Sequence, residues 1–226
     1  MKHAPVYLFY LLGIPEHVAE EYRYVFLAVF VTILLTIVSF WVTSRLEKIP
    51  KGKQNVFEFI LGGLMDFMEE IMGHGARRFL PLVGTLAFFI LTSNLLGLIP
   101  GFDSPTANLN ATGGCAIVVF IATHYYGIKA HGMSYIKQFT GPIPALTPLI
   151  MPIEIISHLV RPVSLSIRLF GNMFGGHLVL ASFLGLVPLI VPLPMMAMEL
   201  FVAGVQTLIF IVLSMIYISL ALEEHH

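Results

Sequence analysis

Charged residues are scarce in this sequence. Only 11% of its 226 residues are charged, whereas an average soluble domain has about a quarter. With 57% hydrophobic residues, a soluble globule could not cover its surface with polar groups, which excludes an ordinary cytosolic enzyme and a disordered chain. The 12 basic and 13 acidic residues nearly cancel, so the chain lacks the excess of positive charge that nucleic-acid binding needs, and we expect no nucleic-acid partner.

Cysteine and the common catalytic motifs are also missing. Cys115 is the single cysteine, which excludes a disulfide framework, a Cys-based zinc site and a Cys-ligated iron–sulfur cluster. There is no P-loop, no Gly-rich phosphate cradle and no nucleophile elbow, so we expect no cofactor and no covalent chemistry. Glu154 and His158 form one lone pair of possible ligands without a His-Glu-x-x-His motif, and we therefore expect no metal site.

Long apolar segments are abundant instead, and they predict an all-α, multi-pass membrane protein. A helical span needs about 20 apolar residues, because each residue rises about 1.5 Å across about 30 Å of hydrocarbon. We expect one membrane domain with about five membrane helices. The expected segments are 24–43, 79–99 and 113–128 as the first three spans, and 142–187 and 193–222 as two long helices.

The segments between these helices are expected to lie at the membrane surface. Residues 1–23 include an apolar stretch too short to span, which we interpret as an outer interfacial segment; a cleaved signal peptide is the alternative. Region 45–78 lies inside and includes residues 56–72, whose apolar side chains recur at helical spacing. This pattern predicts an amphipathic helix on the inner membrane surface, with docking on a partner as the alternative.

The distribution of Lys and Arg sets the orientation. Region 45–78 is rich in both, and Lys129 and Lys137 follow the third span, whereas loop 101–112 carries Asp103 and no basic residue. The positive-inside rule therefore predicts an outer N-terminus and a cytoplasmic C-terminus. Because no transit peptide precedes the first span, we expect a bacterial plasma (inner) membrane, although an organelle-encoded copy would lack one too.

Stretch 142–187 is too long for one upright span, since a helix of this length reaches roughly 65 Å. Two spans with a tight turn would place Arg161 and Arg168 near that turn. We favour one steeply tilted helix that forms a hairpin with a tilted helix at 193–222. Average tilts are about 20°, so a steep tilt requires a packing partner.

One side of this long helix is polar. At 100° per residue, its polar stripe contains Glu154, Ser157, His158, Arg161, Ser164, Arg168 and Asn172. A neighbouring stripe of small residues contains Ser157, Ser164, Gly171 and Gly175. Another helix could approach the backbone closely there, but static helix packing explains the two glycines equally well.

Arg168 is the deepest of these charges. An arginine at the centre of a membrane helix costs about 2.5–3.5 kcal/mol on insertion scales, so something must offset that cost. A static ion pair with Glu154 or Glu199 is one explanation, and a functional partner is the other. Asn94 and His124 are isolated polar groups. Each either lines an aqueous path through the membrane together with these polar residues or forms an ordinary helix–helix hydrogen bond.

The hairpin register pairs four polar residues by depth. Residues equally far from the turn of an antiparallel hairpin lie at equal depth. His177 and Glu199 are centred on position 188, and Arg168 and Gln206 on position 187. We therefore expect a His177–Glu199 layer toward the outside and an Arg168–Gln206 layer deeper in the membrane. Titratable groups at such depths are candidates for a proton relay.

Five motifs together resemble subunit a of the F-type ATP synthases. They are RPVSLSIRLFGNM at 161–173, NLLGLIP at 94–100, PIEIIS at 152–157, QTLIF at 206–210 and the closing EEH. The resemblance covers most of the chain. It implies two long tilted helices against a rotor ring of c subunits, which supplies the packing partner. It also implies the b-subunit peripheral stalk and the lipid bilayer as partners.

The resemblance further implies a stator subunit that forms two proton half-channels and couples proton flow to ATP synthesis. Arg168 matches the essential arginine of the family, and Gln206 the glutamine that faces it. His177 and Glu199 match the polar pair of the outer half-channel. Asn172 and Asn94 fit the lining of that channel; Glu154, Ser157 and His158 fit the exit path; Ser164, Gly171 and Gly175 would face the rotor. Acidic residues that some relatives have near Asn94 are missing.

Two other functions compete with this interpretation. A secondary transporter could use Arg168 to bind an anionic substrate, although such proteins often show repeated halves and this sequence shows none. A structural scaffold would explain the small residues but not the polar pairs at matched depths.

Overall fold

A computed structural model of the chain describes residues 22–44, 46–47, 51–73, 75–99, 102–132, 135, 147–186 and 192–223. Every regular element in these ranges is helical. The elements are α3 (Arg23–Thr43), α4 (Lys53–Met72), η1 (Ala76–Phe79), α5 (Leu80–Leu96), η2 (Pro105–Ala107), α6 (Leu109–His131), α7 (Thr147–Leu186) and α8 (Pro192–Leu222). The expected N-terminal segment up to residue 21, the start of the long stretch at 142–146, the turn near Pro188 and residues 224–226 lie outside the described residues.

Five of the described helices are long and apolar enough to cross a membrane, which confirms the predicted all-α, multi-pass architecture. They cover Arg23–Thr43, Ala76–Leu96, Leu109–His131, Thr147–Phe183 and Leu193–Leu222. The third begins before the expected position 113, because the side chain of Asn108 caps it by accepting a hydrogen bond from the backbone N–H of Asn110 at 2.9 Å.

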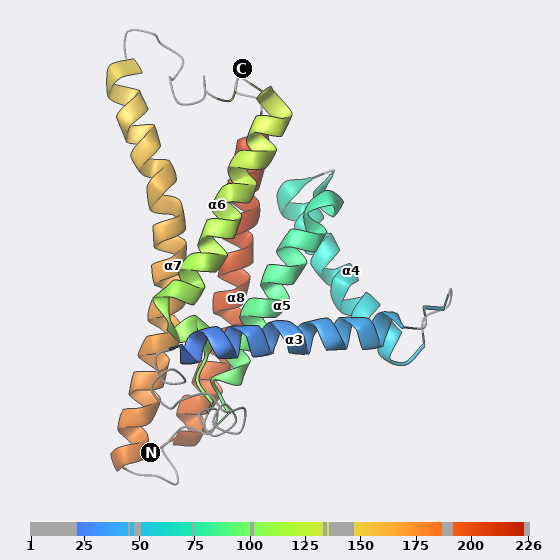
Figure 1. Cartoon of the computed structure of the whole chain (residues 1–226), viewed down its shortest axis with the longest axis vertical. Helices are drawn as coiled ribbons and strands as arrows, with labels where there is room; N and C mark the ends of the chain where they lie inside the picture. The colour runs from blue at the N-terminus through green and yellow to red at the C-terminus, as the bar shows by residue number, and fades with distance from the viewer. Residues whose placement is uncertain are drawn as a thin grey trace.

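The long apolar stretch forms one helix and not two. Helix α7 has 40 residues, which corresponds to about 60 Å. Pro152 and Pro162 lie inside this helix without ending it, so residues 147–186 contain no turn of the kind that two spans would need. Helix α8 packs beside α7 and runs in the opposite direction (Figure 1).

Helix α3 crosses the other long helices, whereas α6, α7 and α8 run alongside one another (Figure 1). With 21 residues, α3 measures about 31 Å, which matches the hydrocarbon thickness of an upright span. If α3 stands upright, α7 and α8 must lie far from upright. Because α6, with 23 residues, also has the length of an upright span and runs alongside α7 and α8, the steep tilt of the hairpin stays a prediction.

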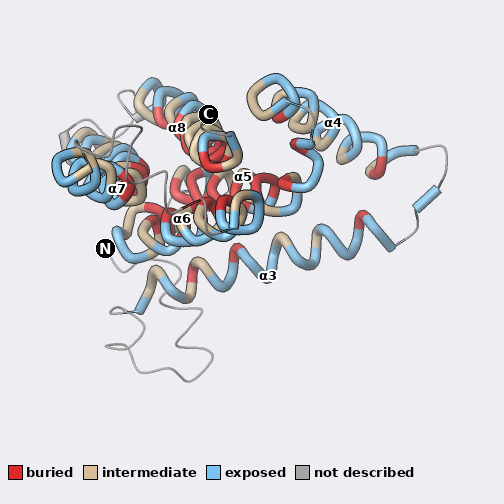
Figure 2. The backbone as a smooth tube through the Cα atoms, turned by 90° about the horizontal axis from the view of Figure 1, so that it is seen from above, coloured by how far each residue is buried: buried red, intermediate tan, exposed pale blue. Residues whose placement is uncertain are grey.

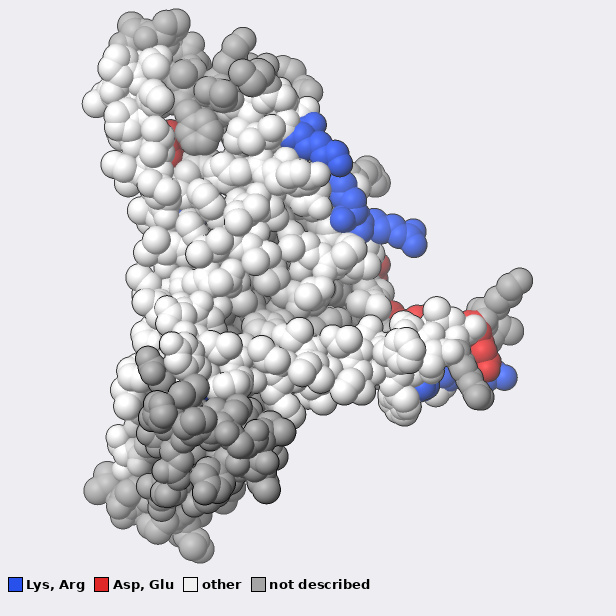
Figure 3. All heavy atoms as spheres, in the orientation of Figure 1, with Lys and Arg blue, Asp and Glu red and all other residues white. Residues whose placement is uncertain are grey.

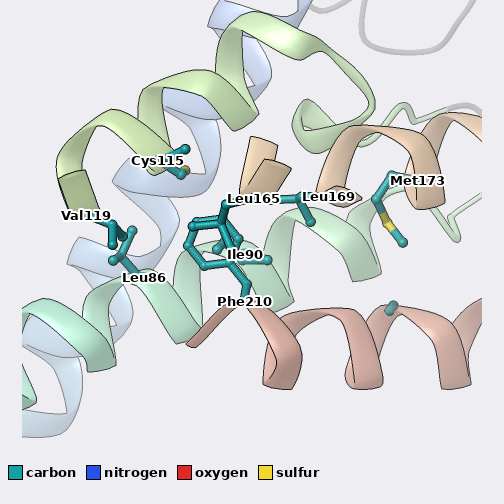
Figure 4. Close-up of a cluster of buried hydrophobic side chains, with 10 residues drawn as sticks. Leu86, Ile90, Cys115, Val119, Leu165, Leu169, Met173 and Phe210 are labelled. Carbon is teal, nitrogen blue, oxygen red and sulfur yellow. The ribbon is translucent and has the colours of Figure 1, made fainter. Parts of the chain in front are cut away.

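The core lies where α5, α6, α7 and α8 face one another, whereas α3 and α4 are mainly exposed (Figure 2). Its central cluster, drawn in Figure 4, includes Leu86, Ile90, Cys115, Val119, Leu165, Leu169, Met173 and Phe210. The surface over α6 and α7 shows few charged side chains (Figure 3). Such a surface suits hydrocarbon and apolar partners.

Segments that the sequence assigns to one side of the membrane also lie together in the fold. Arg23, at the start of α3, forms an ion pair with Asp103 after α5, with 2.6 Å between Nη2 and Oδ2. At the opposite end of the helices, Nε2 of His131 lies 3.2 Å from the carbonyl oxygen of Leu222. The C-terminal ends of α6 and α8 therefore lie side by side. The fold thus agrees with the alternation of spans on which the predicted orientation depends.

Candidate functional site

A cavity of about 280 Å³ opens between α5, α7 and α8. Six predicted site residues line it: Asn94 from α5, Gly171, Asn172, Gly175 and His177 from α7, and Glu199 from α8. A volume of this size has room for about nine water molecules at about 30 Å³ each. The fold thus brings polar groups from three helices to one space that water can fill.

His177 and Glu199 line this cavity together, as the predicted hairpin register requires. The side chain of Glu199 reaches the backbone of α7, because a Cβ added at Gly176 would lie 2.7 Å from its Oε1. This oxygen is buried and has no hydrogen-bond partner among the described residues. A buried carboxyl oxygen without a protein partner is a site for water.

The deeper predicted layer contains Gln206, which is 1% exposed. Its Oε1 accepts a hydrogen bond of 2.5 Å from Nδ2 of Asn172. Its Nε2 is buried without a hydrogen-bond partner in the described part of the chain. Because Asn172 lies on the exposed side of α7, this pair connects the surface of α7 to the interior of α8.

Arg168 lies exposed on α7. Neither acid considered for a static ion pair contacts it: Oε1 of Glu154 lies 3.4 Å from Nδ1 of His158, and Glu199 lines the cavity. Within the described ranges, Arg168 has no ion pair and no hydrogen bond. At Gly171 and Gly175, which line the cavity, an added Cβ would meet nothing within 4 Å, so there is open space beside the backbone of α7 near Arg168.

Asn94 belongs to a buried polar network that connects three segments. Its Nδ2 donates to the carbonyl oxygen of Ala203 and to Oγ1 of Thr207 on α8, both at 3.3 Å. Its Oδ1 accepts from Oγ1 of Thr106 in η2 at 2.6 Å. The Ser104 hydroxyl lies 2.5 Å from that of Thr106. The sequence left two roles open for Asn94, lining an aqueous path or forming ordinary helix–helix hydrogen bonds. In the structure it forms such hydrogen bonds and also lines the cavity.

A second polar cluster lies nearer the start of α7. His158 is 6% exposed, and its Nδ1 lies 3.1 Å from the carbonyl oxygen of Glu154. Its ring centroid lies 5.7 Å from that of His124 on α6. The guanidinium of Arg161 stacks on the ring of Tyr217 at 5.2 Å. The structure thus brings Glu154 and His158 together, whereas Ser157 is exposed.

Sequence reasoning missed Tyr217 as a neighbour of Arg161. The register that pairs Arg168 with Gln206 is centred on position 187 and places 161 at the depth of position 213, about one helical turn from Tyr217, so it gave only an approximate signal. Sequence reasoning also missed Tyr135, which follows α6, as a neighbour of Arg161. Burial raises the pKa of the Tyr135 hydroxyl, and the nearby positive charge of Arg161 opposes that increase.

Comparison with known proteins identifies the family. The sequence model of the family described as ATP synthase A chain matches residues 25–219. The chain belongs to this family. It is 51% identical over 215 residues to ATP synthase subunit a 3 of Pelobacter propionicus, covering 95% of this chain and 93% of that relative. ATP synthase subunit a of Geobacter sulfurreducens is 50% identical, with the same coverage.

A further relative, ATP synthase subunit a of Trichlorobacter lovleyi, is 54% identical over 196 residues, covering 87% of this chain and 85% of that relative. Membership of the ATP synthase A chain family confirms the resemblance inferred from the motifs. It supports the ATP synthase interpretation and not the secondary transporter.

Proposed function

We propose that this chain conducts protons to and from a rotor ring of c subunits, with Arg168 on the surface that faces the ring. The exposure of Arg168 carries this proposal. An arginine within a membrane helix requires an offsetting partner, and no described residue pairs with it. A carboxylate on a rotor helix would supply that partner, because a fixed cation stabilises an ionised carboxylate in low dielectric.

The cavity between α5, α7 and α8 is the proposed outer half-channel. A proton entering from outside would meet His177 and Glu199 and then pass Asn172 and Gln206 toward the rotor carboxylate. Water filling the cavity would support each step, since it can bridge groups that do not touch. Arg168 would hold each deprotonated carboxylate between the channels and block a direct leak.

Glu154, Ser157 and His158 are the proposed exit path on the inner side. Glu154 and His158 contact each other near the start of α7, on the far side of Arg168 from the cavity. A proton released by the ring would leave there, so that entry and exit are separated along one helix.

The proposed rotor contact includes Ser164, Gly171 and Gly175. At both glycines the backbone is open to a close approach by another helix. The b-subunit peripheral stalk and the lipid bilayer are the other proposed partners. We propose a bacterial inner membrane, with the N-terminus outside and the C-terminus cytoplasmic.

ATP-driven acidification of inverted vesicles by the assembled complex tests this function. We expect Arg168→Ala to abolish pumping while the complex still assembles, because the rotor carboxylate loses its cationic partner. Arg77→Ala is the matched control: Arg77 is also an exposed arginine, but it lies before α5 and outside the proposed path, so pumping should be unchanged. Retained pumping by an assembled Arg168→Ala complex would falsify the proposal.

A further inference from the structure

Gly97 follows α5 and has an ordinary helical backbone. Its φ of −65° and ψ of −17° lie in the right-handed region, which every L-residue can adopt. The glycine is therefore not required by the backbone conformation. The space beside it is occupied, since a Cβ built at this position would lie 2.6 Å from Nε2 of His177 and 2.8 Å from Cβ of Ser104.

Ser104 is held firmly on its side of this contact. Its hydroxyl donates to the carbonyl oxygen of Ser93 at 2.8 Å and contacts the hydroxyl of Thr106, which donates to Asn94. All four residues are buried, and breaking a buried hydrogen bond costs about 1–3 kcal/mol. A side chain at position 97 would therefore clash with Cβ of Ser104 and with the imidazole of His177, and the imidazole is the part that can turn away.

We propose that Gly97 is a positioning residue, whose missing side chain makes the seat in which the His177 imidazole lies at the wall of the cavity. The inference rests on the proposed function of that cavity. It adds a residue just after α5 that contacts no rotor carboxylate and acts through His177. A methyl group at position 97 would push the imidazole out of its seat and misplace it within the outer path.

Several charged groups surround this seat. Glu199 of α8 lines the same cavity, and Arg168 lies two and a half turns earlier on α7. Asp103, in the loop after α5, acts on His177 electrostatically and is paired with Arg23 of α3. No described residue of α6 lines the cavity. Any pH profile that reports His177 therefore includes the influence of these four groups.

The first test is ATP-driven pumping by the intact complex in proteoliposomes at a series of lumenal pH values. We expect Gly97→Ala to lower the rate by about tenfold, as small misplacements of proton-transfer groups do. It should also flatten the pH dependence between about pH 5 and pH 8, where a histidine titrates. Gly114→Ala is the matched control, because an added Cβ in this helical glycine meets nothing within 4 Å.

A double-mutant cycle tests whether the effect of Gly97→Ala on pumping acts through His177. Gly97→Ala combined with His177→Ala should be little worse than His177→Ala alone, because the clash with the imidazole is then gone and only the contact of the added methyl with Cβ of Ser104 remains. If Gly97→Ala prevents assembly, His177→Ala should restore it. A wild-type rate and profile for Gly97→Ala, or a defect that multiplies with that of His177→Ala, would overturn the inference.

Chemical modification gives a readout that does not depend on pumping. The probe is diethylpyrocarbonate, and mass spectrometry measures its reaction with His177 in the assembled complex. We expect faster modification of His177 in Gly97→Ala, because its Nε2 leaves the contact with position 97 and faces the cavity. An unchanged or slower reaction would contradict the proposal that Gly97 positions the imidazole. Failure of the proposed function is separate, since it would appear as pumping that is independent of Arg168.

Discussion

Asn94 and Gln206 are both buried amides on packed helices, but their hydrogen bonding differs. Both polar atoms of Asn94 have partners on η2 and α8. Gln206 uses Oε1 to accept from Asn172, while its Nε2 has no partner within the described residues. At the residue scale, the network of Asn94 is expected to support stability, and the incomplete bonding of Gln206 is expected to serve function.

Replacing Thr106 tests the first expectation. Thr106→Val keeps the shape of the side chain but removes the hydroxyl that donates to Oδ1 of Asn94, leaving a buried acceptor unsatisfied. We expect a loss of about 1–3 kcal/mol in the free energy of unfolding, measured by thermal denaturation of the purified complex. Thr106→Ser retains the hydroxyl and should stay close to wild type. Equal stability of the Val and Ser variants would show that the network contributes little.

Replacing Gln206 tests the second expectation, that this residue serves function and not stability. Gln206→Leu removes a buried Nε2 that has no partner and one hydrogen bond to the exposed Asn172, so these effects partly cancel and stability should change by less than about 1 kcal/mol. Pumping should fall by at least about tenfold, since a positioned polar group for proton transfer is lost. Leu208→Ala on the exposed side of α8 is a control for nonspecific effects on this helix. Normal pumping by Gln206→Leu would remove this residue from the path.

At the scale of elements, the α7–α8 hairpin is the part that the sequence predicted best. Its helical periodicity and the two polar pairs needed only local information and one assumption about the turn, and the fold brings His177 and Glu199 to one cavity. The contact of Asn94 with Thr106 and the seat at Gly97 could not be predicted in this way. They depend on how a loop folds back over α5, and hydrophobic periodicity carries no information about that.

The tilt of the hairpin can be measured directly. Labels on cysteines placed at the exposed positions Leu149 and Leu178 of α7 are about 44 Å apart along the helix axis. We expect their depths in the bilayer, from quenching by labelled lipids, to differ by much less than this distance. Val25 and Trp41 on α3, about 24 Å apart, should differ by nearly their full separation. An upright α7 would place one of its two labels outside the hydrocarbon.

At the scale of the whole molecule, helix length and the positions of basic residues predicted the number of spans, but not the crossing of α3 over the bundle (Figure 1). That crossing depends on contacts such as the ion pair of Arg23 with Asp103, which join segments far apart in the sequence. The order of spans along a chain constrains which side each loop occupies, but it leaves the angles between helices free.

The orientation is tested by labelling in right-side-out vesicles. In a Cys115→Ser background, Asn110→Cys should react with an impermeant thiol reagent, because this exposed residue lies at the end of α6 that the proposed orientation places outside. Lys51→Cys, exposed before α4, should react only after the membrane is permeabilised. The opposite pattern would invert the topology, and with it the assignment of entry and exit.

Pro152 and Pro162 make the first half of α7 easier to bend than the second half. A proline lacks the N–H that would bond to the carbonyl four residues earlier, so the helix loses two backbone hydrogen bonds, both before Arg168. Helices bend most easily at such places. The half of α7 with Arg168 and His177 contains no proline. Elastic deformation by a passing neighbour would therefore be absorbed in the first half of the helix, and the spacing of Arg168 and His177 would be preserved.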